Sequence, residues 1–153
     1  MSNTYTQIHI QFVFAVKFRK AQLLPSFKDE LLKYITAVIQ NDGHKLLSIN
    51  SAPDPIHIFI GMRPTQSISD LMKDRKANSS RWINERGFLP TRFEWQGGYG
   101  AFSYRKRDVK GVIDYINKQE IHHLKTTFIE EYIEFLKEFE IDYEEQFIFK
   151  EMI

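Results

Sequence analysis

Cysteine is absent from this sequence of 153 residues. Its absence excludes a disulfide framework, a cysteine nucleophile and every zinc or iron–sulfur site held by thiolates. Any metal ion must therefore be held by histidine, carboxylate or amide oxygen. The lack of cysteine also fits a reducing compartment.

Long apolar segments are missing as well. No stretch approaches the ~20 apolar residues of a membrane-spanning helix. The first five residues lack the basic stretch and apolar run of a signal peptide. Gly97 and Gly98 do not have the spacing of a phosphate-binding loop, which argues against a nucleotide site. We expect a cytoplasmic protein that enters no membrane and acts on no small-molecule substrate.

The charge is nearly balanced, at +1, but it is unevenly distributed. Between Arg63 and Arg107 there are ten Lys and Arg residues against four Asp and Glu. Residues 126–153 carry nine acids against two lysines. This pattern favours a middle region that binds a polyanion and an acidic C-terminal helix that contacts a partner. A solvated mixture of charges is the alternative.

Alternation and helical spacing predict an α+β fold. Residues 5–16 alternate as a strand, with Ile8, Ile10, Phe12 and Phe14 on one face. Further strands are expected at 45–50, 56–62 and 101–104, and helices at 26–41, 67–86, 108–123 and 128–139. This order predicts a ferredoxin-like or RRM-like antiparallel sheet with helices packed on it. We expect one domain over residues 1–153, with residues 126–153 as an acidic helical tail within it.

Two groups of residues are candidates for chemistry. His57 lies on the strongly apolar strand, where a lone histidine is more often a packed side chain than a ligand. Tyr115, Gln119 and either His122 or His123 share one helix face by their spacing. That face would bring a tyrosine nucleophile beside an amide oxygen and a histidine. The alternative is an amphipathic helix with Tyr115 in the core.

Four motifs occur in order along the chain, at residues 53–59 (PDPIHIF), 76–83 (KANSSRWI), 93–103 (FEWQGGYGAFS) and 112–123 (VIDYINKQEIHH). On these motifs the sequence resembles the single-tyrosine HUH transposases, which are small enzymes of insertion sequences and their repeat-associated relatives. The resemblance extends over nearly the whole chain.

The resemblance implies a DNA transposase that cleaves and rejoins single-stranded DNA at hairpin-marked element ends. By this resemblance Tyr115 is the nucleophile and forms a 5′-phosphotyrosine, leaving a free 3′-OH. His57 and Gln119 are then ligands of one divalent cation, Mg²⁺ or Mn²⁺, which polarises the scissile phosphate. Phosphoryl transfer needs an in-line nucleophile and a cation that neutralises charge on the non-bridging oxygens, so these residue types suit the reaction.

The sequence departs from the family pattern at Pro55. The family has its first metal-binding histidine there, and proline has no ligand atom. Losing one of three protein ligands should weaken metal binding. Other side chains near the motifs could replace the missing ligand, namely Asp54, Glu120, His122 and His123. A catalytically impaired member that only binds hairpin DNA is therefore an alternative function.

The family's members are homodimers that extend a sheet across a two-fold axis and often supply the tyrosine helix to the partner's metal site. They bind DNA hairpins. The expected DNA-binding residues of this chain are Lys73, Arg75, Lys76, Arg81, Arg105, Lys106, Arg107 and Tyr99, with unpaired bases stacking on the aromatic side chain. Trp95 and Phe102 fit the core better. An RNA-binding or regulatory ferredoxin-like dimer, with the aromatic first strand as its platform, is the alternative from another class.

Overall fold

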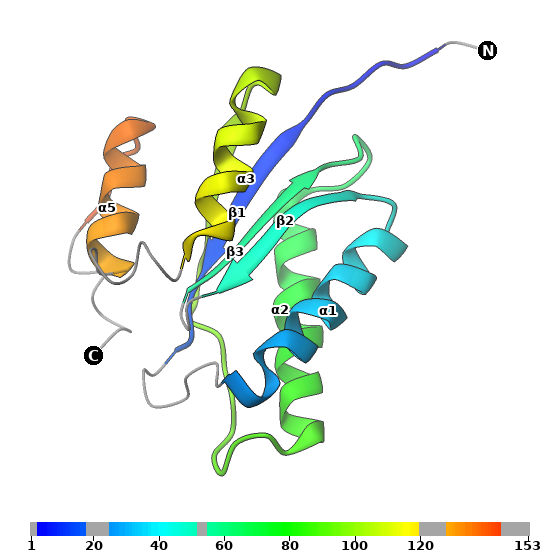
Figure 1. Ribbon diagram of the computed structural model, residues 1–153, viewed down its shortest axis with the longest axis vertical. Coiled ribbons are helices and arrows are strands. Elements are labelled where there is room, and N and C mark those ends of the chain that lie inside the picture. Colours follow the sequence, from blue (N-terminus) through cyan, green and yellow to red (C-terminus); the bar gives the residue numbers. More distant parts are fainter. Residues whose placement is uncertain (1–2, 18–24, 52–54, 120–127, 145–153) are drawn as a thin grey trace.

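The computed structural model describes residues 3–17, 25–51, 55–119 and 128–144. Strands and helices follow one another in the predicted order, with a short 3₁₀ helix before α3. Figure 1 shows their arrangement. The bounds are β1 His9–Phe14, α1 Pro25–Asn41, β2 Lys45–Ser51, β3 Ile56–Gly61, α2 Ile68–Arg86, β4 Gly100–Tyr104, η1 Lys106–Asp108, α3 Val109–Asn117 and α5 Phe128–Glu138.

The four strands form one antiparallel sheet in the order β2-β3-β1-β4. The first strand is shorter than predicted at both ends, and at its C-terminal end the chain changes pairing partner after Phe14. Val16 makes an isolated bridge with Trp95, and the Gln96 amide donates to the Ala15 carbonyl at 2.7 Å. The predicted fold class, an antiparallel sheet with helices packed on it, is confirmed.

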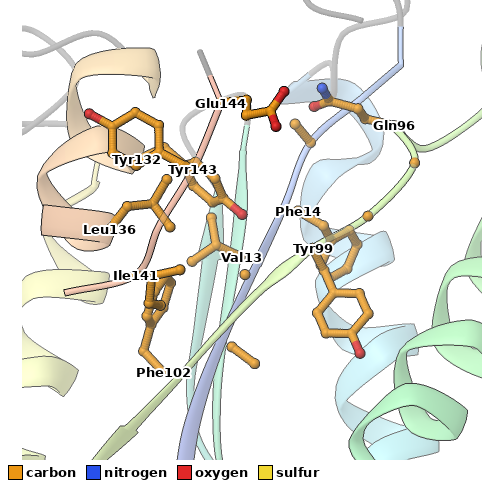
Figure 2. A pocket seen from close by; sticks show the side chains of 15 residues that line it. Val13, Phe14, Gln96, Tyr99, Phe102, Tyr132, Leu136, Ile141, Tyr143 and Glu144 are labelled. Atoms are coloured by element: carbon orange, nitrogen blue, oxygen red, sulfur yellow. The ribbon is translucent and has the colours of Figure 1, made fainter. Parts of the chain in front are cut away.

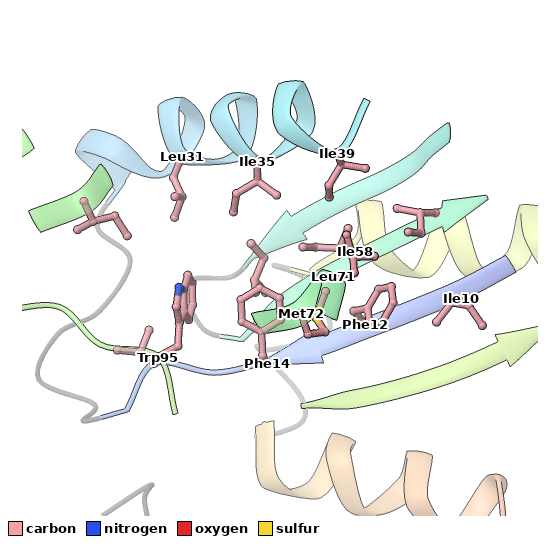
Figure 3. Packing of buried hydrophobic residues seen from close by; sticks show 14 of the residues in the cluster. Ile10, Phe12, Phe14, Leu31, Ile35, Ile39, Ile58, Leu71, Met72 and Trp95 are labelled. Carbon is pink, nitrogen blue, oxygen red and sulfur yellow. The ribbon is translucent and has the colours of Figure 1, made fainter. Parts of the chain in front are cut away.

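One face of the sheet carries the main apolar core, beneath α1 and α2 (Figure 3). Side chains two apart on a strand share a face, so the even-numbered residues of β1 and β3 point into this core. It includes Phe12 and Ile58, both fully buried, together with Leu31 and Ile35 of α1. The predicted alternation of the first strand is thereby confirmed.

The limits of α2 follow from local signals in the sequence. The Ser67 side chain accepts a hydrogen bond from the Asp70 amide at 3.0 Å, which caps the first turn. Gly87 ends the helix in the left-handed conformation at φ 66°, which glycine adopts without strain. These two residues mark the start and the end that the sequence predicted.

The opposite face of the sheet is covered by α3 and α5 (Figure 1). Two side chains of β2 hold α3 in place. The Ser48 hydroxyl donates to Asn117 Oδ1 at 2.8 Å, and Asn50 Nδ2 donates to the Ile116 carbonyl at 2.9 Å. The structure ends α3 at Asn117, short of the predicted end at His123. Lys118 forms a turn, and residues 120–123 lie outside the described residues.

The acidic helix α5 packs closely on the edge strand β4. Phe135 of α5 stacks on Phe102 of β4, with ring centroids 5.1 Å apart. A Cβ atom at Gly100 would come within 3.0 Å of the Tyr132 ring, so this approach depends on glycine. In the described parts of the chain, no helix combines the length and the apolar character needed to span a membrane. The extent of the domain stays a prediction.

Candidate active site

His57 is the second residue of β3 and lies on the face covered by α3 and α5. In the sheet it pairs with Val13 of β1 and with Asn50 of β2, and its side chain is fully buried. Its Nδ1 lies 2.9 Å from Nε2 of Gln11, which is also fully buried. Its Nε2 lies 3.0 Å from Oε1 of Glu131 on α5. The histidine is thus held from both sides by polar partners, unlike a histidine that only fills space.

Tyr115 and Gln119 meet the same carboxylate. The Tyr115 hydroxyl donates to Glu131 Oε2, and Gln119 Nε2 donates to that oxygen at 3.4 Å. The rings of Tyr115 and His57 have centroids 6.1 Å apart. The structure therefore brings together the three residues singled out as nucleophile and metal ligands, within one chain.

Glu131 is the residue that sequence reasoning missed. It is 3% exposed, and its two carboxylate oxygens contact His57 on one side and Tyr115 and Gln119 on the other. Nothing in the sequence separates it from the other acids of α5, because its role depends on how that helix docks. We call the set of Gln11, His57, Tyr115, Gln119 and Glu131 the polar cluster.

A second hydrogen bond extends this polar cluster across the sheet. The Tyr104 hydroxyl donates to Gln11 Oε1 at 2.8 Å, so the Gln11 amide links Tyr104 to His57. Here the sequence did carry a signal. Gln11 is the polar residue in the middle of an otherwise apolar strand, and a buried amide at such a position requires hydrogen-bond partners.

Burial raises the pKa of the Tyr115 hydroxyl well above its ordinary value, and the Glu131 carboxylate that accepts its hydrogen bond raises it further. Burial likewise raises the pKa of Tyr104, with nearby Glu138 adding to the effect. Both phenols are therefore protonated at neutral pH, and Tyr115 needs a cation or a changed environment to become a strong nucleophile.

The donor set fits a divalent cation. Gln119 Oε1 is buried and has no hydrogen-bond partner among the described residues, which leaves an amide oxygen for a metal. Imidazole nitrogen, amide oxygen and carboxylate oxygen are ligands that Mg²⁺ or Mn²⁺ accepts. Within the described residues no group of three or more His, Cys, Asp and Glu side chains is placed to hold a metal ion, so the amide is needed to complete three donors.

The substitute ligands suggested by the sequence are not placed by the structure. Asp54, Glu120, His122 and His123 all lie outside the described residues. Pro55, directly before β3, is described and buried. It offers no ligand atom, as the sequence indicated.

An open cleft of about 730 Å³ lies between α3 and α5 beside the polar cluster. Tyr115 and Glu131 line it, and so do Arg105 and Arg107 from the segment that precedes α3. Acidic side chains of α5, Glu134 among them, line the same cleft. Lys106 is exposed but does not line it. The candidate nucleophile thus faces a cleft whose wall carries both cationic and acidic groups.

The basic residues of α2 lie on the other face of the sheet, away from the polar cluster (Figure 1). Lys73 and Arg81 are exposed. Arg75 is 7% exposed, and its guanidinium is paired with Asp42 at 2.8 Å. Arg75 therefore joins α2 to the chain after α1, a placement that does not suit the expected contact with DNA.

Lys76 has a structural contact that the sequence did not indicate. Its Nζ donates to the carbonyls of Gln96 and Gly98, at 2.6 and 2.9 Å, and so fixes the glycine-rich loop before β4. Tyr99 in this loop is 37% exposed. Figure 2 shows Tyr99 at a second pocket, of about 370 Å³, with Tyr132 and Leu136 of α5 on the other side.

The remaining aromatic residues are core residues. Trp95 and Phe102 are 7% and 2% exposed, in agreement with the expectation that they pack inside. The aromatic face of the first strand, which would be the platform of an RNA-binding protein, is buried against α1 and α2. This placement argues against the RNA-binding alternative.

Comparison with known proteins gives a consistent result. Residues 4–119 match the model of a family described as "Transposase IS200 like". The ISDra2 transposase TnpA of Deinococcus radiodurans is 25% identical over 75 residues, which are 49% of this chain and 54% of that protein. The chain thus spans about half the length of this curated relative.

Two solved structures share the fold. A crystal structure of a proposed transposase from Deinococcus radiodurans R1 matches with a TM-score of 0.62 and 20% identity, over 78% of this chain and 95% of that one. A structure of a REP-associated tyrosine transposase bound to a REP hairpin matches with a TM-score of 0.60 and 16% identity, over 80% of this chain and 73% of that one.

Proposed function

The chain belongs to the IS200-like transposase family, and we propose that it cleaves and rejoins single-stranded DNA with Tyr115 as the nucleophile. The observation that carries this proposal is the convergence of Tyr115, His57 and Gln119 on one buried carboxylate beside an open cleft. A tyrosine held next to candidate metal ligands is the arrangement that phosphoryl transfer to a protein side chain requires.

In the proposed reaction, the Tyr115 oxygen attacks the phosphorus of the scissile phosphodiester. The bond from phosphorus to the 3′ oxygen breaks, which leaves a 5′-phosphotyrosine and a free 3′-OH. Rejoining reverses these steps with the 3′-OH of another strand. A Mg²⁺ or Mn²⁺ ion held by His57 and Gln119 would neutralise charge on the non-bridging oxygens of the phosphate. Tyr115 lies beside His57 of its own chain, which supports attack in cis.

The proposed DNA is a single strand that carries a hairpin, as in the REP-associated relative. Arg105 and Arg107 line the cleft next to Tyr115 and are placed to bind the phosphates around the cleavage site. Lys106 lies between them and is exposed. Lys73 and Arg81 are exposed on the other side of the sheet, where they could contact a hairpin stem. Tyr99 offers a partly exposed ring for an unpaired base.

A homodimer is also proposed. The sheet order leaves β2 and β4 at the edges, and an edge strand can pair with the same strand of a second copy. Light scattering after size-exclusion chromatography measures the mass directly. A monomer at all concentrations, with and without DNA, would contradict this part of the proposal.

The test is a covalent-adduct assay. The protein is incubated with a hairpin-bearing single strand and Mn²⁺, and the products are separated under denaturing conditions. We expect an adduct that is absent in Tyr115→Phe and retained in Tyr5→Phe, which alters a tyrosine that is 88% exposed. Hairpin binding without any adduct would favour the catalytically impaired alternative, for which the proline at position 55 is the supporting observation.

Pro55→His tests whether the metal centre is correctly placed. A histidine at position 55 should lie on the same side of the strand as His57, because the two positions are two residues apart. We expect it to raise the affinity for Mn²⁺. An unchanged affinity in a folded variant would mean that the metal does not bind at this end of β3.

A further inference from the structure

We propose that Glu131 of α5 is the third protein ligand of the divalent cation, alongside His57 and Gln119. This inference rests on the proposed function, because it names a further residue of the same metal centre. It assigns the missing ligand to a helix that follows the tyrosine helix in the chain. This assignment does not call on the four substitutes suggested by the sequence.

Glu131 is the one residue of the polar cluster that contacts all of His57, Tyr115 and Gln119. One carboxylate oxygen faces the histidine, and the other faces the tyrosine and the glutamine. The carboxylate therefore stands between the two expected metal ligands and the candidate nucleophile.

Two ligands that occupy neighbouring corners of an octahedron, each at about 2.1 Å from Mg²⁺, are roughly 3 Å apart. His57 Nε2 lies 3.0 Å from Glu131 Oε1, and Gln119 Nε2 lies 3.4 Å from Glu131 Oε2. A half-turn of the Gln119 amide exchanges its nitrogen for the oxygen that now has no partner among the described residues. Each of these two pairs is thus already spaced like neighbouring ligands of a small cation, with Glu131 common to both.

Neutral imidazole and an amide bring no negative charge to a divalent cation, whereas Mg²⁺ and Mn²⁺ favour carboxylate oxygen. Burying a carboxylate is costly unless a cation or several donors compensate it. Glu131 is 3% exposed, so a bound cation would offset a cost that hydrogen bonds alone must otherwise offset.

The hydrogen-bond partner of His57 is also compatible with a metal ligand at this position. To bind a metal through Nε2, the imidazole must carry its proton on Nδ1, which then needs an acceptor. Gln11 lies 2.9 Å from Nδ1 and can present Oε1 to it while its Nε2 turns to the Tyr104 oxygen. The Gln11 amide therefore serves either tautomer of His57. The surroundings of the histidine are compatible with metal binding without any change of backbone.

The test is Mn²⁺ binding by isothermal titration calorimetry on the full chain without DNA. Glu131→Gln keeps the size of the side chain and removes its charge. We expect it to weaken Mn²⁺ binding by about tenfold or more. Glu130→Gln is the matched control, since it removes the same charge from the neighbouring exposed residue of α5, and it should bind like the wild type. Circular dichroism shows that each variant is folded.

A second variant keeps the test informative if Glu131→Gln does not fold. Glu131→Asp retains the carboxylate on a shorter side chain and should bind Mn²⁺ better than Glu131→Gln. Wild-type affinity in Glu131→Gln, or no Mn²⁺ binding by the wild type, would overturn the proposal. Tighter binding in Glu131→Gln would also overturn it, because the carboxylate would then be blocking the centre.

The adduct assay distinguishes a failure of the proposed function from a failure of the Glu131 assignment. A tyrosine adduct with unchanged Mn²⁺ affinity in Glu131→Gln would leave the proposed function standing and remove Glu131 from the centre. Mn²⁺ binding that depends on both His57 and Glu131, in a protein that forms no adduct with any hairpin substrate, would confirm the ligand and contradict the proposed reaction.

Discussion

The two faces of the sheet are built from the same strands and differ in chemistry. Under α1 and α2 the strands present Phe12, Ile58 and other apolar side chains that need no partners. Under α3 and α5 the same strands present Gln11 and His57, which are as deeply buried but are satisfied only by specific hydrogen bonds. Apolar burial stabilises a fold without a specific hydrogen-bond partner for each group, whereas buried polar groups are costly unless each one is paired. The first face therefore contributes chiefly apolar burial, whereas the second adds the paired polar cluster to the apolar packing of Phe59 and Phe102.

Phe12→Ala is expected to have the largest effect on stability. It removes a fully buried ring from the core under α1 and α2 and leaves a cavity, which should lower the free energy of unfolding by about 3–5 kcal/mol. Urea denaturation followed by circular dichroism measures this loss. Tyr5→Ala, at an 88% exposed position, is the control and should change little. If Phe12→Ala lowered the free energy of unfolding as little as the control does, the face under α1 and α2 would not be the main source of stability.

Gln11→Leu should have an intermediate effect. It keeps the approximate volume but leaves His57 and Tyr104 without their shared partner, which should cost about 1–3 kcal/mol. Gln7→Leu changes an exposed glutamine nearby and is the matched control. An increase in stability in Gln11→Leu would show that the amide contributes nothing to the fold and is kept only for the site.

Tyr115→Phe should change stability by less than about 1 kcal/mol, since Glu131 keeps its contacts with His57 and Gln119. The same substitution should abolish the DNA adduct. An unchanged stability together with a lost adduct would show most clearly that the two faces of the sheet differ in role. A loss of stability comparable to that of Phe12→Ala would instead make Tyr115 a core residue.

The smallest effect we expect is a pH dependence that arises at His44, before β2. Burial lowers the pKa of His44 from its ordinary value of 6.5. Protonation therefore favours the unfolded chain, so the contribution of His44 is complete above its unfolded pKa and is lost as the pH falls below it. Urea denaturation at two pH values, about 7.5 and 5.5, should show a smaller difference in His44→Gln than in the wild type. Equal differences would contradict this assignment.

The fold was predictable from the sequence where local signals define it. Ser67 and Gly87 mark the limits of α2, and the alternation from Ile8 to Phe14 identifies the buried face of β1. Strand ends were less predictable, because they depend on pairing partners distant in the sequence. The bridge between Val16 and Trp95, which follows the end of β1, joins segments about eighty residues apart.

The site was predictable only in part. His57, Tyr115 and Gln119 could be named from the motifs, and the structure places them together. Glu131 could not, because its place in the polar cluster depends on the docking of α5 rather than on any pattern within the helix. The burial of Arg75 was missed for a similar reason, since its partner Asp42 lies on a different element.

The position of Glu131 in the chain also has a consequence for protein synthesis. A ribosome releases His57, Tyr115 and Gln119 before it releases the helix that carries Glu131. A nascent chain that has emerged only as far as Gln119 therefore holds a tyrosine and a histidine that lack their common carboxylate. The polar cluster closes only when α5 folds back onto β4. The polar cluster is therefore complete only after α5, the last helix that the structure describes, has been synthesised and has folded.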